Sequence, residues 1–566
     1  MQGKQLIECV PNFSEGRDLS IIKQITDAIE AVDGVQLLDV DPGKATNRTV
    51  VTFVGEPEPV IRAACAAMAK AAELIDMSTH TGEHPRMGAT DVCPLIPIAN
   101  ITMEEVVKWA HRLGEMAGRE LGIPLYMYEQ AATRPERQNL ASVRAGEYEA
   151  LPEKLTKPEW HPDYGPIVFN PKAGATAIGA RDFLIAYNVN LNTTSVRRAN
   201  SVAFDVREKG RVKRSGNPIT GQIIRDANNE PVRESGLCKG VKAIGWFIEE
   251  YGIAQISMNI TNVRLTSLHE AFEACRNSAS NRGMRVTGSE LVGLVPLQVM
   301  LDAGRYFLEK QQRSAGVSEE EIIRIAVRSM GLDELSSFDP QKKIIEYRLA
   351  ALRKNPLLEM DLKAFANETA SESVAPGGGS ISAYVGALGV SLATMVANIS
   401  SHRRVWDHRW DEFSKWAEKG QEIKDALLSL VDEDTRSFNA IIEAIRLPKG
   451  SDSEKENRKK AIQNATRYAI EVPFRVMTLS LQAFEIIEEM VHSGNPNSVT
   501  DAGVGALCAR AAVHGAFMNV RINGADLDDQ AFVKEITEQG QKMTAEADQR
   551  EEEVRKHIDL VIAGKA

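Results

Sequence analysis

LIECVPNFSEGRDLSIIKQITDAIEAVDGVQLLDVDPGKATNRTVVTFV, residues 6–54, is the stretch that decides the fold of the first part of the chain. Residues 6–10 have the composition of a strand, and residues 19–32 carry isoleucines at the spacing of an amphipathic helix. Residues 35–40 and 50–54 are rich in β-branched side chains and are separated by the turn sequence Asp-Pro-Gly. The stretch therefore predicts a strand, a helix and two further strands, in that order.

The following residues complete the pattern. We predict an Ala-rich helix over 60–75, a strand over 92–98, a helix over 104–121 and a strand over 125–128. The order β-α-β-β-α-β is that of the split βαβ motif. A similar order is predicted again, without a clear sequence repeat, from strands over 183–189, 241–248, 253–260 and 285–287 and helices over 195–207 and 268–281. Residues 208–240, which are polar and rich in Gly, Pro and Asn, are expected to form a surface insertion.

From about Asp361 the strand patterns stop, and the rest of the chain has the pattern of long amphipathic helices. The most apolar stretch, AYVGALGVSLATMVANI at 383–399, is shorter than the ~20 residues that a membrane span needs. We expect it to form a buried helix packed through small residues. The predicted fold class is α/β plus all-α, with two α/β subdomains at 1–180 and 181–349, a linker at 350–360 and a helical domain at 361–566.

The composition excludes several classes of protein. Of the 566 residues 43% are hydrophobic and 26% charged, which is typical of a globular chain with a core and not of a collagenous or disordered one. A formal net charge of −11 argues against general nucleic-acid binding. The six cysteines are scattered and form no CxxC pair, which argues against a disulfide framework and a thiolate zinc site. Without the apolar run of a signal peptide, we expect a cytoplasmic protein that binds no membrane.

The loop HTGEHPRMG, residues 80–88, is the first candidate for chemistry. Because its two glycines and proline exclude a helix, the spacing of His80 and His84 is not that of a helical metal-binding pair. An imidazole titrates near neutral pH, so His84, flanked by Glu83 and Arg86, can take up and return a proton. The alternative is a histidine that only hydrogen-bonds the loop.

Arginines and asparagines recur at the ends of the predicted strands. Guanidinium groups bind carboxylates in a bidentate manner, so a cleft with several of them would suit a dicarboxylate substrate. For any single one of them, a solvent-exposed role in solubility is the alternative. The residues are Asn12, Asn47, Arg48, Arg86, Arg181, Asn188 and Asn190.

The helical part supplies a candidate acid. Over residues 424–445 the apolar stripe consists of Leu427, Leu430, Val431, Phe438, Ile441, Ile442 and Ile445. Spacing of three and four residues puts Asp434 at an inward position, with Asp432 and Glu433 turned away from the centre of the stripe. A carboxyl group placed there should be desolvated, which raises its pKa and suits a general acid near neutral pH. The alternative is an aspartate that caps or pairs within a helix interface.

The sequence APGGGS at 375–380 stands directly before the small-residue helix. Its glycines expose backbone N–H groups at a helix N-terminus, where anions and polar ligand edges bind. Candidate pocket residues are therefore Gly377, Gly378, Gly379 and Ser380, with Asp501 as a further polar group of the same pocket or a helix cap. The sequence is not GxxxxGK[ST], which argues against a nucleoside triphosphate. Close helix packing with an N-cap serine is the alternative.

Several motifs occur together and in a consistent order. They are ECVPNFSEGRD (8–18), DVDPGKATNRTVVTFVG (39–55), IDMSTHTGEHPRMGATDVCPLIPI (75–98), RAGEYEALP (144–152), the segment 174–191, GSELVGLVPL (288–297), SVAPGGGS (373–380), LVDEDTRSF (430–438) and RLPK (446–449). Through these motifs nearly the whole chain resembles the formimidoyltransferase-cyclodeaminases, the bifunctional folate enzymes of histidine breakdown. The resemblance implies two ferredoxin-like subdomains followed by a helical cyclodeaminase domain.

The resemblance also implies the chemistry and its residues. N-formimidoyl-L-glutamate would give its formimidoyl group to N5 of tetrahydrofolate, with His84 as the base. The helical domain would then close the ring to 5,10-methenyltetrahydrofolate and release ammonia, with Asp434 as the acid. Arg48 and Arg86 are guesses for the substrate carboxylates. The implied folate-binding segment consists of Gly165, Pro166, Ile167, Val168, Phe169, Asn170, Pro171, Lys172, Ala173 and Gly174.

Neither implied step needs a metal or a tightly bound cofactor, and tetrahydrofolate is the cosubstrate. Folates often carry a polyglutamate tail, for which the basic candidates are Lys172, Arg197, Arg198, Lys209, Arg211, Lys213 and Arg214. The family further suggests a homo-oligomer. One alternative is an N-formylglutamate formyltransferase fused to a methenyltetrahydrofolate cyclohydrolase. Another is a non-catalytic scaffold whose helical part only assembles subunits.

Overall fold

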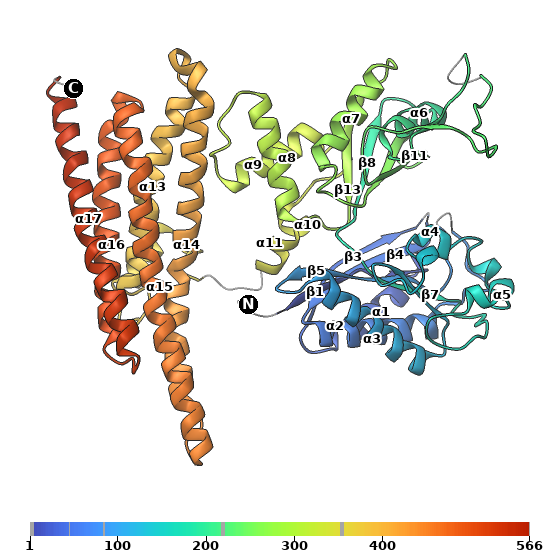
Figure 1. The fold of residues 1–566 in the computed structure, drawn as a ribbon, viewed down its shortest axis with the longest axis horizontal. Coiled ribbons are helices and arrows are strands. Elements are labelled where there is room, and N and C mark those ends of the chain that lie inside the picture. The colour runs from blue at the N-terminus through green and yellow to red at the C-terminus, as the bar shows by residue number, and fades with distance from the viewer. Residues whose placement is uncertain (1–4, 45, 83–84, 217–220, 351–355, 565–566) are drawn as a thin grey trace. The chain divides into compact units, whose positions relative to one another are not determined.

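The structure, a computed structural model, describes residues 5–44, 46–82, 85–216, 221–350 and 356–564. The chain forms two compact units. Unit 1 comprises Met1–Val299 and Met330–Leu349, and unit 2 comprises Met300–Ser329 and Ala350–Ala566. Unit 1 combines sheets with helices, whereas the described residues of unit 2 are helical (Figure 1). The predicted fold class, α/β followed by all-α, is confirmed.

The first sheet of unit 1 contains the predicted β-α-β-β-α-β order. Its elements are β1 (Leu6–Cys9), α1 (Leu19–Glu30), β3 (Val35–Gly43), β4 (Arg48–Gly55), α2 (Pro57–Leu74) and β5 (Thr90–Ala99). The strands lie in the order β3-β4-β1-β5, and all three pairings are antiparallel, as in a ferredoxin-like sheet. The short β2 (Asn12–Phe13) continues the line of β1 between β4 and β5.

Two further strands extend this sheet beyond the predicted motif. They follow α3 (Met103–Leu121) and are β6 (Leu125–Glu129) and β7 (Thr176–Ala180). β7 lies between β5 and β6 and is parallel to both. The segment between β6 and β7 holds two short helices, α4 (Leu140–Val143) and α5 (Leu151–Lys154). Sequence patterning did not predict β7, because TAIGA is short and three of its five residues are Ala or Gly, which are depleted in strands.

Helices α1, α2 and α3 cover one face of this sheet (Figure 1). Asp18 begins α1 by accepting from the backbone N–H groups of Ser20 and Ile21. A capping box between Thr102 and Glu105 begins α3, and Gly122, in the left-handed region with φ of 62°, ends it. With apolar strand residues committed to these helices, the polar strand residues lie on the opposite face.

The second sheet repeats the same topology. Its elements are β8 (Ile185–Leu191), α6 (Val196–Val206), β11 (Val241–Ile248), β12 (Ile253–Ile260), α7 (Leu268–Ser280) and β13 (Val286–Val292). The strand order is β11-β12-β8-β13, antiparallel throughout. Gly245 lets α6 lie close to β11, since a Cβ there would be 2.3 Å from the backbone nitrogen of Asn200. The 208–240 insertion contains a small ribbon of β9 (Arg211–Val212) and β10 (Arg233–Glu234).

The predicted subdomain boundary at 349 coincides with a boundary between the units. Most of α8 (Leu297–Lys310) and α9 (Glu319–Met330) group with unit 2. The carbonyl oxygen of Gly316 explains this, because it accepts hydrogen bonds from Asn398 at 2.7 Å and from Gln421 at 3.0 Å. The chain returns to unit 1 for α10 (Pro340–Lys343) and α11 (Ile345–Ala350).

Long helices form the core of unit 2 and run side by side in Figure 1. They are α13 (Gly378–Ser401), α14 (Trp410–Arg446), α15 (Asp452–Ser493), α16 (Val499–Gly524) and α17 (Gln530–Ile562), preceded by the short α12 (Leu362–Thr369). α13 is long and apolar enough to span a membrane, but 61% of its most apolar window is buried within the protein. Gly386 and Gly389 bring it close to its neighbours, which confirms the predicted buried helix packed through small residues.

Candidate active sites

Arg48 begins β4 on the polar face of the first sheet, and its side chain is partly buried. Its Nε donates to Oδ1 of Asn12 at 2.8 Å, which brings together two of the residues predicted at strand ends. Burial lowers the pKa of Arg48 to about 10, so the guanidinium remains charged at neutral pH.

His84 lies outside the described residues, together with Glu83. The residues on both sides of them are held in place. Asn47, with φ of 47°, donates from Nδ2 to the carbonyl oxygen of Thr81, and its own carbonyl oxygen lies 3.0 Å from Nε2 of His80. Gly82 packs against Thr46, where a Cβ would be only 2.3 Å from a carbonyl oxygen. The loop that carries His84 therefore begins beside Arg48, which follows Asn47 directly.

Arg86, predicted as a ligand for substrate carboxylates, contacts carboxylates of the protein itself. Its guanidinium forms ion pairs with Glu147 at 3.0 Å and Glu149 at 2.7 Å, and the hydrogen bond to Glu149 raises its pKa. Its Nε also lies 3.4 Å from Nδ1 of His80. Two protein carboxylates thus pair with this guanidinium, and its role as a ligand for substrate carboxylates stays a prediction.

A cluster of charges that sequence reasoning missed surrounds Arg48. Asp91, 1% exposed, accepts from the backbone of Met87 at 3.0 Å and pairs with Arg144 at 2.8 Å. Arg144 in turn lowers the pKa of Arg48 by charge repulsion. The nearby Tyr128 hydroxyl has its pKa raised to about 12 by burial, against the opposing charges of Arg181 and Arg144. Asp91 and Arg144 both fall within the motifs quoted above. The charged Asp91 stands directly before the apolar residues of a predicted strand, and this pattern could have identified it as a candidate.

The segment 165–174 lies next to this loop. Gly88 and Gly174 form a β-bridge, and a Cβ on Gly174 would be 2.3 Å from the carbonyl oxygen of Met87. Asn170 shapes the turn by accepting from the backbone N–H groups of Lys172 and Ala173. Within the segment the apolar side chains of Ile167 and Val168 are 52% and 66% exposed. An exposed apolar strip beside a charged cluster is consistent with the folate segment implied by the resemblance.

The Lys172 ammonium is already engaged, since it donates to the carbonyl oxygen of Glu73 at 2.5 Å. Among the other basic candidates for a polyglutamate tail, Arg211 pairs with Asp205 and Arg214 donates to the carbonyl oxygen of Gly221. These three basic groups therefore have protein partners.

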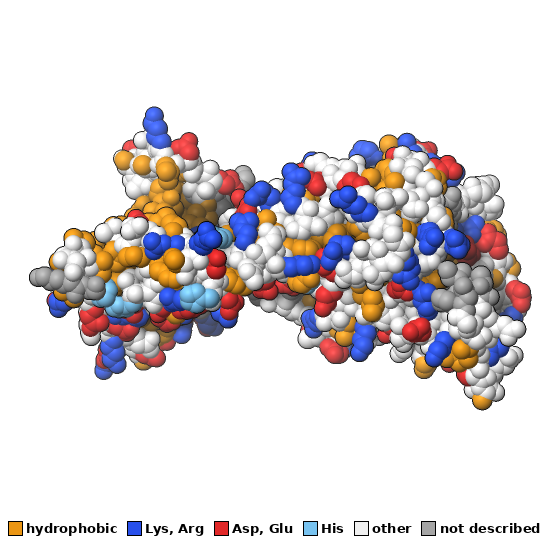
Figure 2. Space-filling model, turned by 90° about the horizontal axis from the view of Figure 1, so that it is seen from above, with side chains coloured by type: hydrophobic (Ala, Val, Ile, Leu, Met, Phe, Trp, Pro, Cys, Tyr) orange, Lys and Arg blue, Asp and Glu red, His pale blue; other side chains and the backbone are white. Residues whose placement is uncertain are grey.

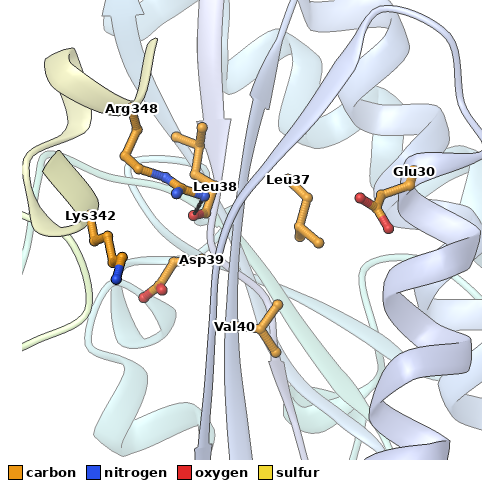
Figure 3. A pocket seen from close by; sticks show the side chains of 7 residues that line it. All are labelled: Glu30, Leu37, Leu38, Asp39, Val40, Lys342 and Arg348. Atoms are coloured by element: carbon orange, nitrogen blue, oxygen red, sulfur yellow. Dashed lines mark hydrogen bonds between the residues drawn. The ribbon is translucent and has the colours of Figure 1, made fainter. Parts of the chain in front are cut away.

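A separate hollow of about 320 Å³ lies at the outer edge of β3 (Figure 3). Arg348 reaches over the strand and donates to the carbonyl oxygen of Leu38, and Lys342 lies beside Asp39. Its lining residues are Glu30, Leu37, Leu38, Asp39, Val40, Lys342 and Arg348. None of the site residues predicted from the sequence lines this hollow, so we place the chemistry elsewhere.

In unit 2 the predicted acid and the predicted glycine turn do lie together. A pocket of about 140 Å³ is lined by Val374, Ala375, Gly377, Gly378, Asp434, Thr435, Ser437, Phe438, Asn439, Ala469, Asn519 and Asn523. Oδ2 of Asp434 accepts from the backbone N–H of Ser380 at 2.9 Å and from its hydroxyl at 3.1 Å. The carboxylate thus caps α13 from a neighbouring helix.

The environment of Asp434 perturbs its titration. Burial raises the pKa of Asp434, and the hydrogen bonds from Ser380 partly oppose that rise. Gly379 leaves room for the carboxylate, since a Cβ at this position would be 2.1 Å from Oδ1 of Asp434. A carboxyl group held in place, with a raised pKa, at the edge of a polar pocket has the properties of a general acid.

Two expectations about this helical site were wrong. Asp432 does not turn away from the core; it is 2% exposed and accepts from the backbone N–H groups of Leu357 and Leu358 at 3.1 and 3.2 Å. Those two donors satisfy the buried carboxylate. Asp501 does not line the pocket, because it lies in the first turn of α16, about 27 Å along the helix from Asn519.

The second half of the predicted apolar stripe on α14 is also not buried, since Phe438 and Ile445 are 47% and 45% exposed. Phe438 instead lines the pocket. The pocket residues that the sequence did not predict include Asn439, Asn519 and Asn523. An asparagine within a helix carries no signal of its own in a single sequence.

Comparison with known proteins covers both units. The N-terminal subdomain of the formiminotransferase domain matches residues 6–181, the formiminotransferase domain matches residues 186–350, and the formiminotransferase-cyclodeaminase model matches residues 361–542. The formimidoyltransferase-cyclodeaminase of Mus musculus is 44% identical over 93% of this chain and 94% of the mouse protein.

Two relatives match one part each. The glutamate formimidoyltransferase of Streptococcus pyogenes serotype M1 is 42% identical over 54% of this chain and 94% of its own length. The methenyltetrahydrofolate cyclohydrolase of Methylorubrum extorquens is 32% identical over 33% of this chain and 89% of its own length. Since the similarity to the mouse protein extends through both units, the chain belongs to the formimidoyltransferase-cyclodeaminase family.

Proposed function

We propose that this chain transfers the formimidoyl group of N-formimidoyl-L-glutamate to N5 of tetrahydrofolate and then converts the product to 5,10-methenyltetrahydrofolate and ammonia. The observation that carries the proposal is the pocket in which Asp434, with a raised pKa, caps the glycine turn of α13. It lies in the part of the chain that matches the cyclodeaminase family model, while the transferase models match unit 1.

In the transferase step N5 attacks the amidine carbon, and the proton on N5 has to leave. We assign the base to His84, on the resemblance of its loop, and the proton then goes to the departing glutamate nitrogen. Arg48 and Arg144 are two partly buried guanidinium groups on the polar face of the first sheet, and Asp91 pairs with Arg144 at 2.8 Å. Because guanidinium groups bind carboxylates in a bidentate manner, these two side chains support binding of the dianionic glutamate part of the substrate on this face of the sheet.

In the cyclodeaminase step N10 attacks the same carbon and loses its proton, and the C–N bond to the amino group breaks. The departing nitrogen leaves as ammonia once it is protonated, and Asp434 is the donor that we assign. The raised pKa increases the protonated fraction of Asp434 near neutral pH. Ser380 orients the carboxyl group through two hydrogen bonds and thereby keeps the acid facing the pocket.

A formyl donor and a cyclohydrolase activity remain the competing proposal, supported by the relative from Methylorubrum extorquens. That relative matches one third of this chain, whereas the bifunctional mouse protein matches 93% of it. The assay that separates the two incubates the enzyme and tetrahydrofolate with either N-formimidoylglutamate or N-formylglutamate. We expect methenyltetrahydrofolate and one ammonia per turnover from the first donor; faster turnover of the second would overturn our assignment.

We also propose a homo-oligomer. On α13 the apolar residues Leu388, Met395 and Ile399 are 46%, 37% and 41% exposed and share one helix face, and on α16 Val504 and Leu507 are each 50% exposed. Helices that are apolar on all sides are usually buried, so a second copy is the expected cover. Hydrophobic side chains also reach the surface elsewhere on the face seen in Figure 2. Light scattering after size exclusion should give a multiple of the chain mass, and a monomer at micromolar concentration would refute this.

We further propose a cytoplasmic location, tetrahydrofolate as a freely exchanging cosubstrate, and activity without a metal. In the described ranges no group of three or more His, Cys, Asp or Glu side chains is arranged to hold a metal ion. Cell fractionation tests the location. Dialysis against a chelator tests the metal, and we expect full activity afterwards.

A further inference from the structure

Two asparagines form the wall of the Asp434 pocket that belongs to α16. Asn519 and Asn523 both line it, and both are half-buried. Their spacing of four residues places them on one face of the helix, one turn apart. The two catalytic steps proposed above assign no role to either asparagine.

Each amide is fixed in orientation by a backbone carbonyl group. Nδ2 of Asn519 donates to the carbonyl oxygen of Gly515 at 2.9 Å, and Nδ2 of Asn523 donates to that of Ala469 at 2.7 Å. A carbonyl oxygen only accepts, so the nitrogen of each amide has to face it and the oxygen has to face away. Neither oxygen has a hydrogen-bond donor among the residues that the structure describes. The α16 wall therefore presents two acceptors.

These acceptors stand next to the acid. A Cβ on Gly378 would lie 3.5 Å from Nδ2 of Asn519, and a Cβ on the following Gly379 would meet the Asp434 carboxylate. Two consecutive glycines thus face the two groups: Gly378 lies next to Asn519, and Gly379 lies next to Asp434. One ligand can reach both from within the same pocket.

We propose that Asn519 and Asn523 bind the N–H donors of the folate pterin ring and so determine how the substrate lies in the cyclodeaminase pocket. This inference rests on the proposed function. The pyrimidine ring of a reduced 2-amino-4-oxopteridine carries the 2-amino and N3–H donors, whereas N5 and its formimidoyl group belong to the other ring. When the two amide oxygens hold the donor side, the formimidoyl nitrogen is directed toward Asp434.

This arrangement makes the pocket selective for pterins that carry the 2-amino group. A site built to accept from a substrate N–H rejects an analogue that lacks it, because the acceptor is then left without a donor. Removal of one such neutral hydrogen bond weakens binding by about 3- to 10-fold. The two asparagines are positioning residues: their loss should weaken binding and slow turnover, but it should leave unshifted the pH dependence that Asp434 sets.

The test measures binding of 5-formimidoyltetrahydrofolate and of its 2-desamino-2-methyl analogue by titration calorimetry. Full-length wild type is compared with Asn519→Leu and Asn523→Leu, and with Asn464→Leu as a control at an exposed asparagine of α15. We expect wild type and the control to bind the analogue about 3- to 10-fold more weakly than the parent. At least one pocket variant should bind the parent more weakly and lose this discrimination, with the pH profile of kcat unchanged.

Equal discrimination in wild type and both pocket variants would overturn the inference. If a leucine variant fails to fold by circular dichroism, Asn519→Asp or Asn523→Asp replaces it, because aspartate keeps the acceptor and loses only the bond to the backbone. Discrimination should persist in the aspartate variants, and its loss there would assign the asparagines a purely structural role. Failure of the proposed function looks different, since wild type would then form no methenyltetrahydrofolate.

Discussion

The sharpest test of the helical site is Gly379→Ala, which adds a single methyl group. The new Cβ would be 2.1 Å from Oδ1 of Asp434, and an ordinary contact needs about 3.4 Å, so the carboxylate has to move by about 1.3 Å. A displacement of about 1 Å from a productive geometry costs about 100-fold in rate. We therefore expect the cyclodeaminase kcat to fall about 100-fold while the formimidoyltransferase activity stays unchanged.

The effect on stability should be small. Moving the carboxylate weakens its bond to the backbone of Ser380, and a hydrogen bond to a charged group contributes about 1.5–3 kcal/mol. Alanine in place of glycine within a helix stabilises the folded protein by about 1 kcal/mol, because alanine has the higher helix propensity. The net destabilisation of about 0.5–2 kcal/mol leaves the protein folded, so the loss of activity can be attributed to the position of the acid.

Gly378→Ala is the matched control. Its Cβ would lie 3.5 Å from Nδ2 of Asn519, an ordinary contact, and Asp434 is not among its nearest atoms. We expect its cyclodeaminase kcat to stay within about threefold of wild type, a far smaller change than a displaced acid causes, with any loss confined to KM. The assay follows ammonia release from purified 5-formimidoyltetrahydrofolate. Wild-type kcat in folded Gly379→Ala would refute the role of the Asp434 geometry.

Three further variants test unit 1. Burial raises the pKa of Glu8 from 4.5 to about 7, so the stability that its protonated form provides is complete below pH 4.5 and is lost as pH rises through about 7. Urea denaturation of Glu8→Gln should therefore match wild type at pH 4 and show a gain of up to about 3 kcal/mol at pH 8; an equal gain at both would contradict this. Arg137→Leu breaks a buried ion pair with Asp163 and should cost about 3–5 kcal/mol by the same method, whereas exposed Arg134→Leu should cost under about 1 kcal/mol. Arg48→Met should lower transferase kcat/KM for formimidoylglutamate by about 10- to 100-fold, and unchanged kinetics would remove Arg48 from the substrate site.

The sequence predicted both β-α-β-β-α-β orders because their strands and helices differ clearly in period. It missed β7, whose residues Thr176–Ala180 are mostly small. It also could not place residues 300–329 with unit 2, since the carbonyl oxygen of Gly316 is bonded by residues about 80 and 105 positions further along the chain. The period of the hydrophobic residues identifies a helix, but it does not show which other helices that helix packs against.

The same reasoning explains the outcome at the sites. Asp434 was found because a carboxyl group interrupts an apolar stripe, yet Asp432 is more deeply buried, since backbone N–H groups from the interdomain segment satisfy it. Arg86 was assigned to substrate because Glu147 and Glu149 stand about 60 residues away in the sequence. Charge partners that are distant in sequence are not visible without a structure.

Complementation between His84→Ala and Asp434→Asn measures the central claim most directly, because the account places the two proton transfers in separate sites that share a diffusible folate. With formimidoylglutamate and tetrahydrofolate, the first variant should form no product and the second should accumulate 5-formimidoyltetrahydrofolate. Mixing the two purified variants should restore formation of methenyltetrahydrofolate and ammonia. Two results would contradict the account: Asp434→Asn fails to accumulate 5-formimidoyltetrahydrofolate, or the mixture of the two variants forms no methenyltetrahydrofolate.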